Sequence, residues 1–152
     1  MTATHEPLQP AHPIPRVGEV TIRVRYCECD PMGVVHHASY PPWLEMGRTE
    51  MLREAGESYA AMEAAGLFLV IVKVDCSYKR PARYDDLIEI RTTLVQATRV
   101  KLRHSYELYR VWKSDAPDDT TPELVMTAST LLACVDGDGR PTPLPEWFST
   151  SG

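Results

Sequence analysis

The residues best suited to catalysis lie close together near the start of the chain. Asp30 carries a carboxylate, His37 an imidazole and Tyr26 a phenol. A carboxylate can attack an electrophile or act as a general base, and an imidazole or a phenol can orient it or transfer a proton. These three residues form a candidate catalytic group if the fold brings their side chains to one cleft.

The position of Asp30 between a predicted strand and a predicted helix favours such a cleft. The segment 29–33, Cys-Asp-Pro-Met-Gly, has the composition of a turn, and helix N-termini attract anions. We expect His37 to reach the carboxylate from the far side of this loop and Tyr26 to reach it from the strand. The alternatives are a loop aspartate that forms an Asx-turn, and a solvated pair made by His36 and His37.

The sequence around this loop predicts one strand followed by one long helix. Apolar and polar residues alternate over 20–27, as in a strand with one buried face. After Pro42 the apolar residues recur at the spacing of one helical face. Gly56 weakens this pattern, but the helix formers around it extend the predicted helix to Ala65, with Gly66 as the stop.

Strand-like sequence fills the rest of the chain. Further strands are predicted over 67–78, 87–97, 102–112 and 124–135. The run 67–72 is apolar on both faces, which is typical of a strand covered by a helix on one side and by a second subunit on the other. This order of elements predicts an α+β fold in which a five-stranded antiparallel sheet wraps around one long central helix.

The overall composition predicts a single globular domain. The chain has 152 residues, of which 43% are hydrophobic, and this length accommodates one core. We expect a flexible proline-rich arm over 1–17 and the folded domain over 18–150. The formal net charge of −5 argues against a nucleic-acid partner, and the sequence has no apolar run of about 18 residues that would predict a membrane span.

The cysteines, Cys27, Cys29, Cys76 and Cys134, predict neither a zinc site nor a disulfide framework. They form no Cys-x-x-Cys pair, and Cys27 and Cys29 would share one face of a strand. The first residues also lack the basic start and the apolar stretch of a secretory signal. We therefore expect free thiols in a cytoplasmic protein, with no bound metal.

The segment 26–40 reads YCECDPMGVVHHASY and is followed by Glu45 and the run 48–53. These residues together resemble the signature of the 4-hydroxybenzoyl-CoA thioesterase family. They are most similar to the branch of acyl-CoA thioesterases associated with the Tol-Pal cluster. Further likeness follows at Tyr78, 81–83, 85–86 and 103–105 and ends near 143–145, so that the resemblance covers about residues 18–147.

This resemblance implies a hotdog fold, usually assembled as a tetramer of two dimers with active sites at the dimer interface. It implies that the aspartate matching Asp30 attacks the thioester carbonyl or activates the water that does so. The backbone amides of Gly33, Val34 and Val35 match positions near the substrate carbonyl, where an oxyanion develops. No cofactor is implied, because coenzyme A is part of the substrate.

The resemblance also implies roles for neighbouring side chains. His37 and Tyr26 match positions that orient the carboxylate, the water or the thioester, and His36 matches an aromatic position in the pocket wall. Two departures bear on the pocket, since Cys29 replaces a usual threonine and the pair 31–32, Pro-Met, replaces smaller residues. The loop thereby loses one amide donor and gains a thioether beside the carboxylate.

Basic residues in the second half of the chain are candidates for binding the phosphates of coenzyme A. Arg99, Lys101 and Arg103 alternate onto one face near the start of the predicted fourth strand. Arg99 and Lys101 match basic positions in the family, and Arg83 and Lys79 are further candidates. The alternative is an exposed sheet edge protected by charge.

Charged residues also occur on the predicted helix. Glu45 and Glu50 lie close to Arg48 in the sequence, and Arg48 could pair with either one. Because acidic residues on helix surfaces are usually solvated or ion-paired, we assign no catalytic role to these two.

The resulting hypothesis is that the chain hydrolyses a short-chain or aromatic acyl-CoA and works as a homodimer or homotetramer. Two other classes stay open, an acyl-thioester hydratase or dehydratase and a non-catalytic protein that binds or senses acyl-CoA. The segment around Asp30 fits thioesterases better than hydratases. The sequence does not decide whether the acyl group is carried by coenzyme A or by a carrier protein.

Overall fold

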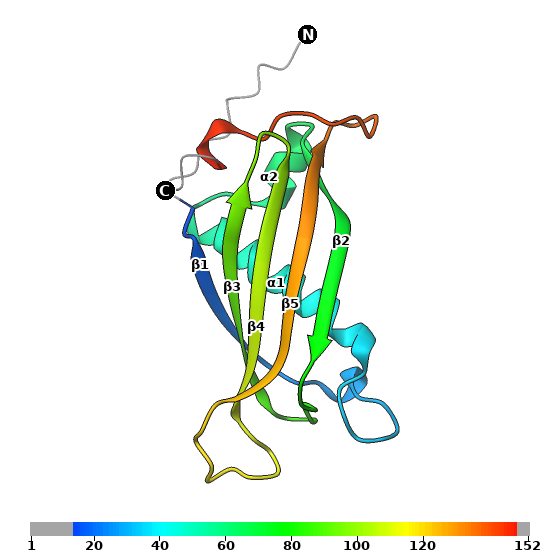
Figure 1. Cartoon of the computed structure of the whole chain (residues 1–152), viewed down its shortest axis with the longest axis vertical. Helices are drawn as coiled ribbons and strands as arrows, with labels where there is room; N and C mark the ends of the chain where they lie inside the picture. The colour runs from blue at the N-terminus through cyan, green and yellow to red at the C-terminus, as the bar shows by residue number, and fades with distance from the viewer. Residues whose placement is uncertain (1–13, 149–152) are drawn as a thin grey trace.

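A curved sheet with a helix along one face forms the body of the protein (Figure 1). The computed structural model describes residues 14–148. The sheet is antiparallel and five-stranded, with the strand order β1-β3-β4-β5-β2. The strands are β1 (Val17–Arg23), β2 (Phe68–Tyr78), β3 (Leu87–Ala97), β4 (Lys101–Trp112) and β5 (Glu123–Val135), and the helices are α1 (Tyr40–Glu54) and α2 (Tyr59–Ala64). This architecture confirms the predicted α+β hotdog fold.

Gly47 lets α1 approach the sheet closely. A Cβ atom at this position would lie 2.4 Å from Oγ1 of Thr92 and 3.1 Å from Cγ2 of Ile90, both on β3. Only a glycine fits here without displacing β3 side chains. The apolar face of α1 is therefore sealed against the sheet, and Trp43 and Leu44 are fully buried.

The helical region is divided in two, so the prediction of one continuous helix to Ala65 is wrong. α1 ends at Glu54, and Gly56 adopts a left-handed conformation with a φ of 84°. Ser58 then caps α2, because its Oγ accepts a hydrogen bond from the Ala61 N–H at 3.1 Å. A glycine followed closely by a serine is the sequence feature that marks the break.

The predicted strand over 20–27 is wrong at its C-terminal end. The pairing of β1 with β3 stops at Arg23, which lies opposite Leu87, the first residue of β3. No β3 residue remains to pair with the chain beyond this point, and Tyr26–Glu28 form a short 3-10 helix. Tyr26 is therefore not positioned by a strand.

The cysteines are free thiols, as predicted. Cys134 is buried, whereas Cys27 is exposed. Cys27 and Cys29 do not share a strand face, because β1 has ended before either of them.

β2 is an edge strand that exposes apolar side chains. It pairs with β5 alone, and a bulge at Val72 shifts the register, because Ile71 lies opposite Leu132 whereas Lys73 lies opposite Leu131. The large apolar residues of this strand that are 42–54% exposed are Val70, Ile71, Val72, Val74 and Tyr78. The second subunit expected to cover them stays a prediction.

Both ends of the described chain pack onto the core, since Ile14 and Phe148 are buried. The described part of the predicted arm 1–17 therefore belongs to the folded body, while 1–13 lie outside the described residues. The last two residues of the predicted domain also lie outside them. In the part of the chain that is described, no helix is long and apolar enough to cross a membrane.

Candidate active site

Asp30 occupies the first position of a tight turn. The Gly33 N–H donates to the Asp30 carbonyl oxygen at 2.9 Å, which closes the turn around Pro31 and Met32. The Met32 N–H donates to Oδ1 of Asp30 at 2.9 Å. The Asx-turn considered as an alternative is therefore present. It uses one carboxylate oxygen, and Oδ2 accepts no hydrogen bond from the described residues.

Backbone bridges join this turn to the body of the protein. The Asp30 N–H donates to the Val34 carbonyl at 2.9 Å, and the Val35 N–H donates to the Ala82 carbonyl at 2.8 Å. The segment that carries Ala82 is fixed by the fully buried Asp86, whose carboxylate accepts two backbone N–H groups. The Asp30–Val34 bond closes the loop on itself, and the Val35–Ala82 bond joins the loop to the segment that carries Ala82.

Glu28 fastens the same loop to α1. Its buried carboxylate accepts hydrogen bonds from the indole Nε1–H of Trp43 at 2.6 Å and from the Arg25 N–H at 2.8 Å. Its carbonyl oxygen accepts the His36 N–H at 2.8 Å and the Ser39 hydroxyl at 3.0 Å. One residue therefore ties together the chain before the Asp30 turn, the chain after it and the first turn of α1.

The charged form of Glu28 is the stable one in this setting. Burial raises the pKa of its carboxyl, but the hydrogen bonds from Arg25 and Trp43 outweigh burial and hold the pKa below its usual value. Sequence reasoning missed Glu28. The available signal was a glutamate three residues after the start of a short turn, where its carboxylate can reach back to a free N–H.

Asp30 and His37 line one open cleft of about 370 Å³, as predicted. The remaining lining residues are Val35, Tyr40, Tyr78, Lys79, Arg80 and Pro81. Tyr26 is not among them. Its side chain is 81% exposed and packs edge-on against Tyr84, with ring centroids 5.6 Å apart. The expectation that Tyr26 converges on this cleft from a strand therefore fails.

Two other phenols occupy the cleft instead. Tyr40 at the start of α1 and Tyr78 at the end of β2 have ring centroids 5.3 Å apart. Burial, with Tyr78 nearby, raises the pKa of Tyr40 to about 12, and burial raises the pKa of Tyr78 as well. Both side chains stay protonated near neutral pH and can donate a hydrogen bond. Sequence reasoning missed this pair because its members come from distant elements.

The three amides expected to face an oxyanion are not equally available. The Gly33 N–H is used within the turn, and the Val35 N–H is used by Ala82. The Val34 N–H has no hydrogen-bond partner among the described residues. Of the predicted donors, Val34 is therefore the one whose N–H is unused, although Val34 is not among the residues that line the Asp30 cleft.

His36 supports the loop, and it is absent from the lining of the Asp30 cleft. Its Nδ1 accepts the Ala38 N–H at 3.0 Å, and its ring lies 4.2 Å from that of His37. Both histidines are exposed. Within residues 14–148, no group of three or more His, Cys, Asp or Glu side chains is placed to hold a metal ion.

The basic residues expected to bind phosphates fall at two ends of the sheet. Arg99 and Lys101 lie at the β3–β4 hairpin, at the top of Figure 1, whereas the loop before α1 lies at the bottom. The ten residue steps of β3 separate these ends by about 33 Å. Lys79 lies beside the Asp30 cleft, and Arg83 pairs with Asp115 at 3.3 Å.

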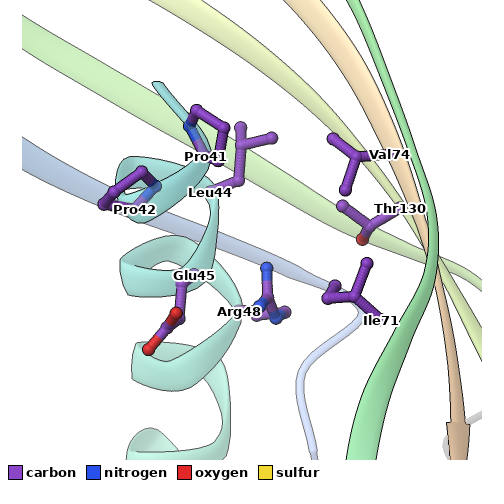
Figure 2. Close-up of a pocket in the computed structure, with 8 residues that line it drawn as sticks. All are labelled: Pro41, Pro42, Leu44, Glu45, Arg48, Ile71, Val74 and Thr130. Carbon is purple, nitrogen blue, oxygen red and sulfur yellow. The ribbon is translucent and has the colours of Figure 1, made fainter. Parts of the chain in front are cut away.

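A second pocket, of about 230 Å³, lies between α1 and β2 (Figure 2). It is lined by Pro41, Pro42, Leu44, Glu45, Arg48, Ile71, Val74 and Thr130. The Arg48 side chain extends from α1 towards Ile71 and Thr130, and Arg48 is only 9% exposed. The expected pairing with Glu45 or Glu50 is wrong, because Arg48 makes no ion pair with any described residue and Glu50 pairs with Arg53.

A neutral histidine lies beneath Arg48. His104 on β4 is buried, and its Nδ1 has no hydrogen-bond partner among the described residues. Burial first, and the positive charge of Arg48 second, lower the pKa of His104 to about 4. On the same face of the sheet, Tyr106 and Thr130 share a hydrogen bond of 2.7 Å between their hydroxyls.

Residues 24–151 match the model of the Thioesterase-like superfamily, which is more than half of the chain. The chain belongs to this superfamily. The match includes the Asp30 turn, both helices and the strands β2 to β5. Membership in the thioesterase-like superfamily confirms the family expected from the segment 26–40.

Known proteins of similar sequence extend over most of the chain. The acyl-CoA thioester hydrolase YbgC of Escherichia coli O6:H1 is 33% identical over 126 residues, which cover 82% of this chain and 87% of YbgC. YneP of Bacillus subtilis (strain 168) is 32% identical over 138 residues, which cover 88% of this chain and 94% of YneP. The solved structure of 4-hydroxybenzoyl-CoA thioesterase from Pseudomonas sp. strain CBS-3 has a TM-score of 0.76 at 22% identity, covering 88% of this chain and 98% of that one. This last similarity shows a shared fold.

Burial of His104 predicts a pH dependence of stability. Its pKa in the folded state, about 4, lies below the ordinary value of 6.5, so the unfolded state binds more protons between these pH values. The free energy of unfolding should therefore fall by up to about 3 kcal/mol through this group as the pH drops from 6.5 to 4. Urea unfolding at several pH values should show that His104→Gln loses this part of the dependence.

His37→Gln is the matched control, because His37 is exposed. Its free energy of unfolding should follow the wild-type pH profile. Identical profiles for wild type and His104→Gln would contradict the assignment of a buried neutral imidazole.

Proposed function

We propose that this protein hydrolyses acyl-CoA thioesters to a free acid and coenzyme A, with Asp30 as the catalytic carboxylate. The similarity to YbgC, which is named an acyl-CoA thioester hydrolase, supports this reaction. The observation that carries the assignment is the state of Asp30, since Oδ2 of its carboxylate is unoccupied by described residues at the wall of an open cleft. A carboxylate placed in this way is available to a substrate.

The free carboxylate oxygen has two chemical routes to the thioester. It attacks the carbonyl carbon and forms a mixed anhydride that water then hydrolyses, or it takes a proton from the attacking water. In both routes the C–S bond breaks, and the thiolate of coenzyme A leaves and takes up a proton. In this proposal His37 orients the water or the thioester from the same cleft wall.

The oxyanion formed on the carbonyl needs donors. We assign this role to the Val34 N–H, because the neighbouring Gly33 and Val35 amides already have partners. The phenol of Tyr78 is a second donor in the same cleft if a ligand replaces its long hydrogen bond of 3.5 Å to the His37 carbonyl. One donor of this kind contributes about 2.7–4 kcal/mol of transition-state stabilisation.

The phosphates of coenzyme A require cations outside the cleft. Lys79 and Arg80 border it and form no ion pair with the described residues, which supports a role in binding them. Arg83 is less suited, because Asp115 already neutralises it. Arg99 and Lys101, at the far end of the sheet, would serve only a substrate whose thioester lies in the cleft of another subunit.

We propose that the acyl group of the substrate is short-chain or aromatic.

We also propose that two chains associate through β2. This edge strand leaves its backbone unpaired on one side and exposes five large apolar side chains. A long apolar edge is a template for pairing with another chain. A second copy would cover it and close the pocket between α1 and β2.

Replacement of Asp30 tests the proposed reaction. Asp30→Asn keeps the shape of the side chain and its hydrogen bond from Met32, but removes the negative charge. We expect kcat/KM to fall by about 10²–10⁴-fold, because the base or nucleophile is lost. Release of free thiol from a panel of acyl-CoA substrates measures the change.

Asp118→Asn is the matched control, because Asp118 is an exposed carboxylate in the loop between β4 and β5. It should hydrolyse the panel at the wild-type rate. Equal rates for wild type and Asp30→Asn would remove Asp30 from the mechanism. Tight binding without turnover by the wild type would instead identify an acyl-CoA sensor.

A charge placed on β2 tests the proposed assembly. Light scattering of the wild type at micromolar concentration should give a dimer or a larger species. Val72→Glu should reduce its mass to that of the monomer, because a carboxylate would be buried in the contact. Val95→Glu, at an exposed valine on β3, should leave the assembly intact. A monomeric wild type would contradict the proposal.

A further inference from the structure

We propose that the pocket between α1 and β2 holds the far end of the acyl group, and that Arg48 selects acyl groups that end in a carboxylate. This inference rests on the proposed thioesterase function. It assigns a substrate class, the thioesters that dicarboxylic acids form through one of their two carboxyl groups. Apart from Arg48 and Glu45, the lining of the pocket along α1 and β2 is apolar (Figure 2).

Arg48 is a buried cation without a counter-charge among the described residues. It is only 9% exposed, and its Nε has no hydrogen-bond partner among the described residues. No described carboxylate lies within ion-pair distance of its guanidinium. A buried cation without a counter-charge is costly, and the cost is offset when an anion binds to it. The guanidinium fork matches the geometry of a carboxylate.

The surroundings of Arg48 inside the fold are neutral. Inside the fold, Arg48 hydrogen-bonds to the phenols of Tyr59 and Tyr106 and lies near the uncharged imidazole of His104. None of them balances a positive charge. Glu45 lies at the exposed mouth of the pocket and makes no ion pair with the described residues. The interior end of the pocket is therefore electropositive.

The pocket lies next to the Asp30 cleft along both α1 and β2. The bulge at Val72 turns Ile71 and Val74 towards α1, and they line the pocket, while Tyr78 on the same strand lines the cleft. On α1, Tyr40 of the cleft is followed directly by residues of the pocket. The two cavities share no lining residue, but they are neighbours along both α1 and β2.

The helix sets the length of acyl group that fits. From Tyr40 to Arg48, α1 rises by about 12 Å, and the Arg48 side chain covers part of this span. A thioester carbonyl beside Asp30 then leaves room for a chain of a few methylene groups before the guanidinium. Adipyl-CoA and suberyl-CoA bracket this length, and hexanoyl-CoA and octanoyl-CoA are their uncharged counterparts with the same number of carbons.

Steady-state hydrolysis of these matched pairs gives the first test. Wild type should show a kcat/KM at least about tenfold higher for the better dicarboxylic thioester than for its uncharged counterpart. Arg48→Met, which keeps the volume and removes the charge, should reverse this preference. Arg53→Met, at an exposed arginine of the same helix, should keep the wild-type preference. Equal rates for both members of each pair in wild type would overturn the inference.

Binding to Asp30→Asn separates this inference from the proposed function. Calorimetric titration should show that Asp30→Asn binds the dicarboxylic thioester at least about tenfold more tightly, and that adding Arg48→Met abolishes the difference. This result would support the anion site even if no thioester were hydrolysed. Hydrolysis by wild type together with equal binding of both thioesters would leave the function standing and overturn the role of Arg48. The comparison within Asp30→Asn decides the matter even if Arg48→Met fails to fold.

Discussion

The carboxylate of Glu28, buried between the end of β1 and the start of α1, holds the proposed catalytic loop in place. Its hydrogen bonds to Trp43 and to the Arg25 amide join two elements that would otherwise be linked only by a loop. Its carbonyl binds the chain on the far side of the Asp30 turn. A loop with exposed proline and methionine at its tip is therefore fixed relative to α1, and the Asp30 carboxylate has a defined position at the cleft.

The gap between α1 and the edge strand β2 is the second constraint. Gly47 brings α1 close to β3, whereas space for a ligand remains between α1 and the edge strand β2. The Asp30 cleft opens at one end of this gap, and the unpaired Arg48 lies further along it. In the proposed enzyme, a negative charge and a positive charge thus act on two ends of one acyl group.

The sequence was most informative where local physics decides the structure. Periodicity predicted the strands and α1, and Asp-Pro-x-Gly predicted the turn that carries Asp30. The sequence was least informative where the two partners of a contact come from distant segments. Glu28 and Arg48 depend on residues of other elements, and nothing local distinguishes a buried helix arginine from a solvated one. The role of Arg99 in binding phosphates stays a prediction, because a basic residue in a hairpin does not reveal which end of the sheet carries the active site.

A crystal structure of the Asp30→Asn variant with a bound acyl-CoA tests the central claim most directly. The account predicts that the thioester carbonyl oxygen lies about 2.7–3.1 Å from the Val34 nitrogen, with the side chain at position 30 beside the carbonyl carbon. A thioester bound away from the cleft formed by the Asp30 turn, α1 and β2 would contradict it.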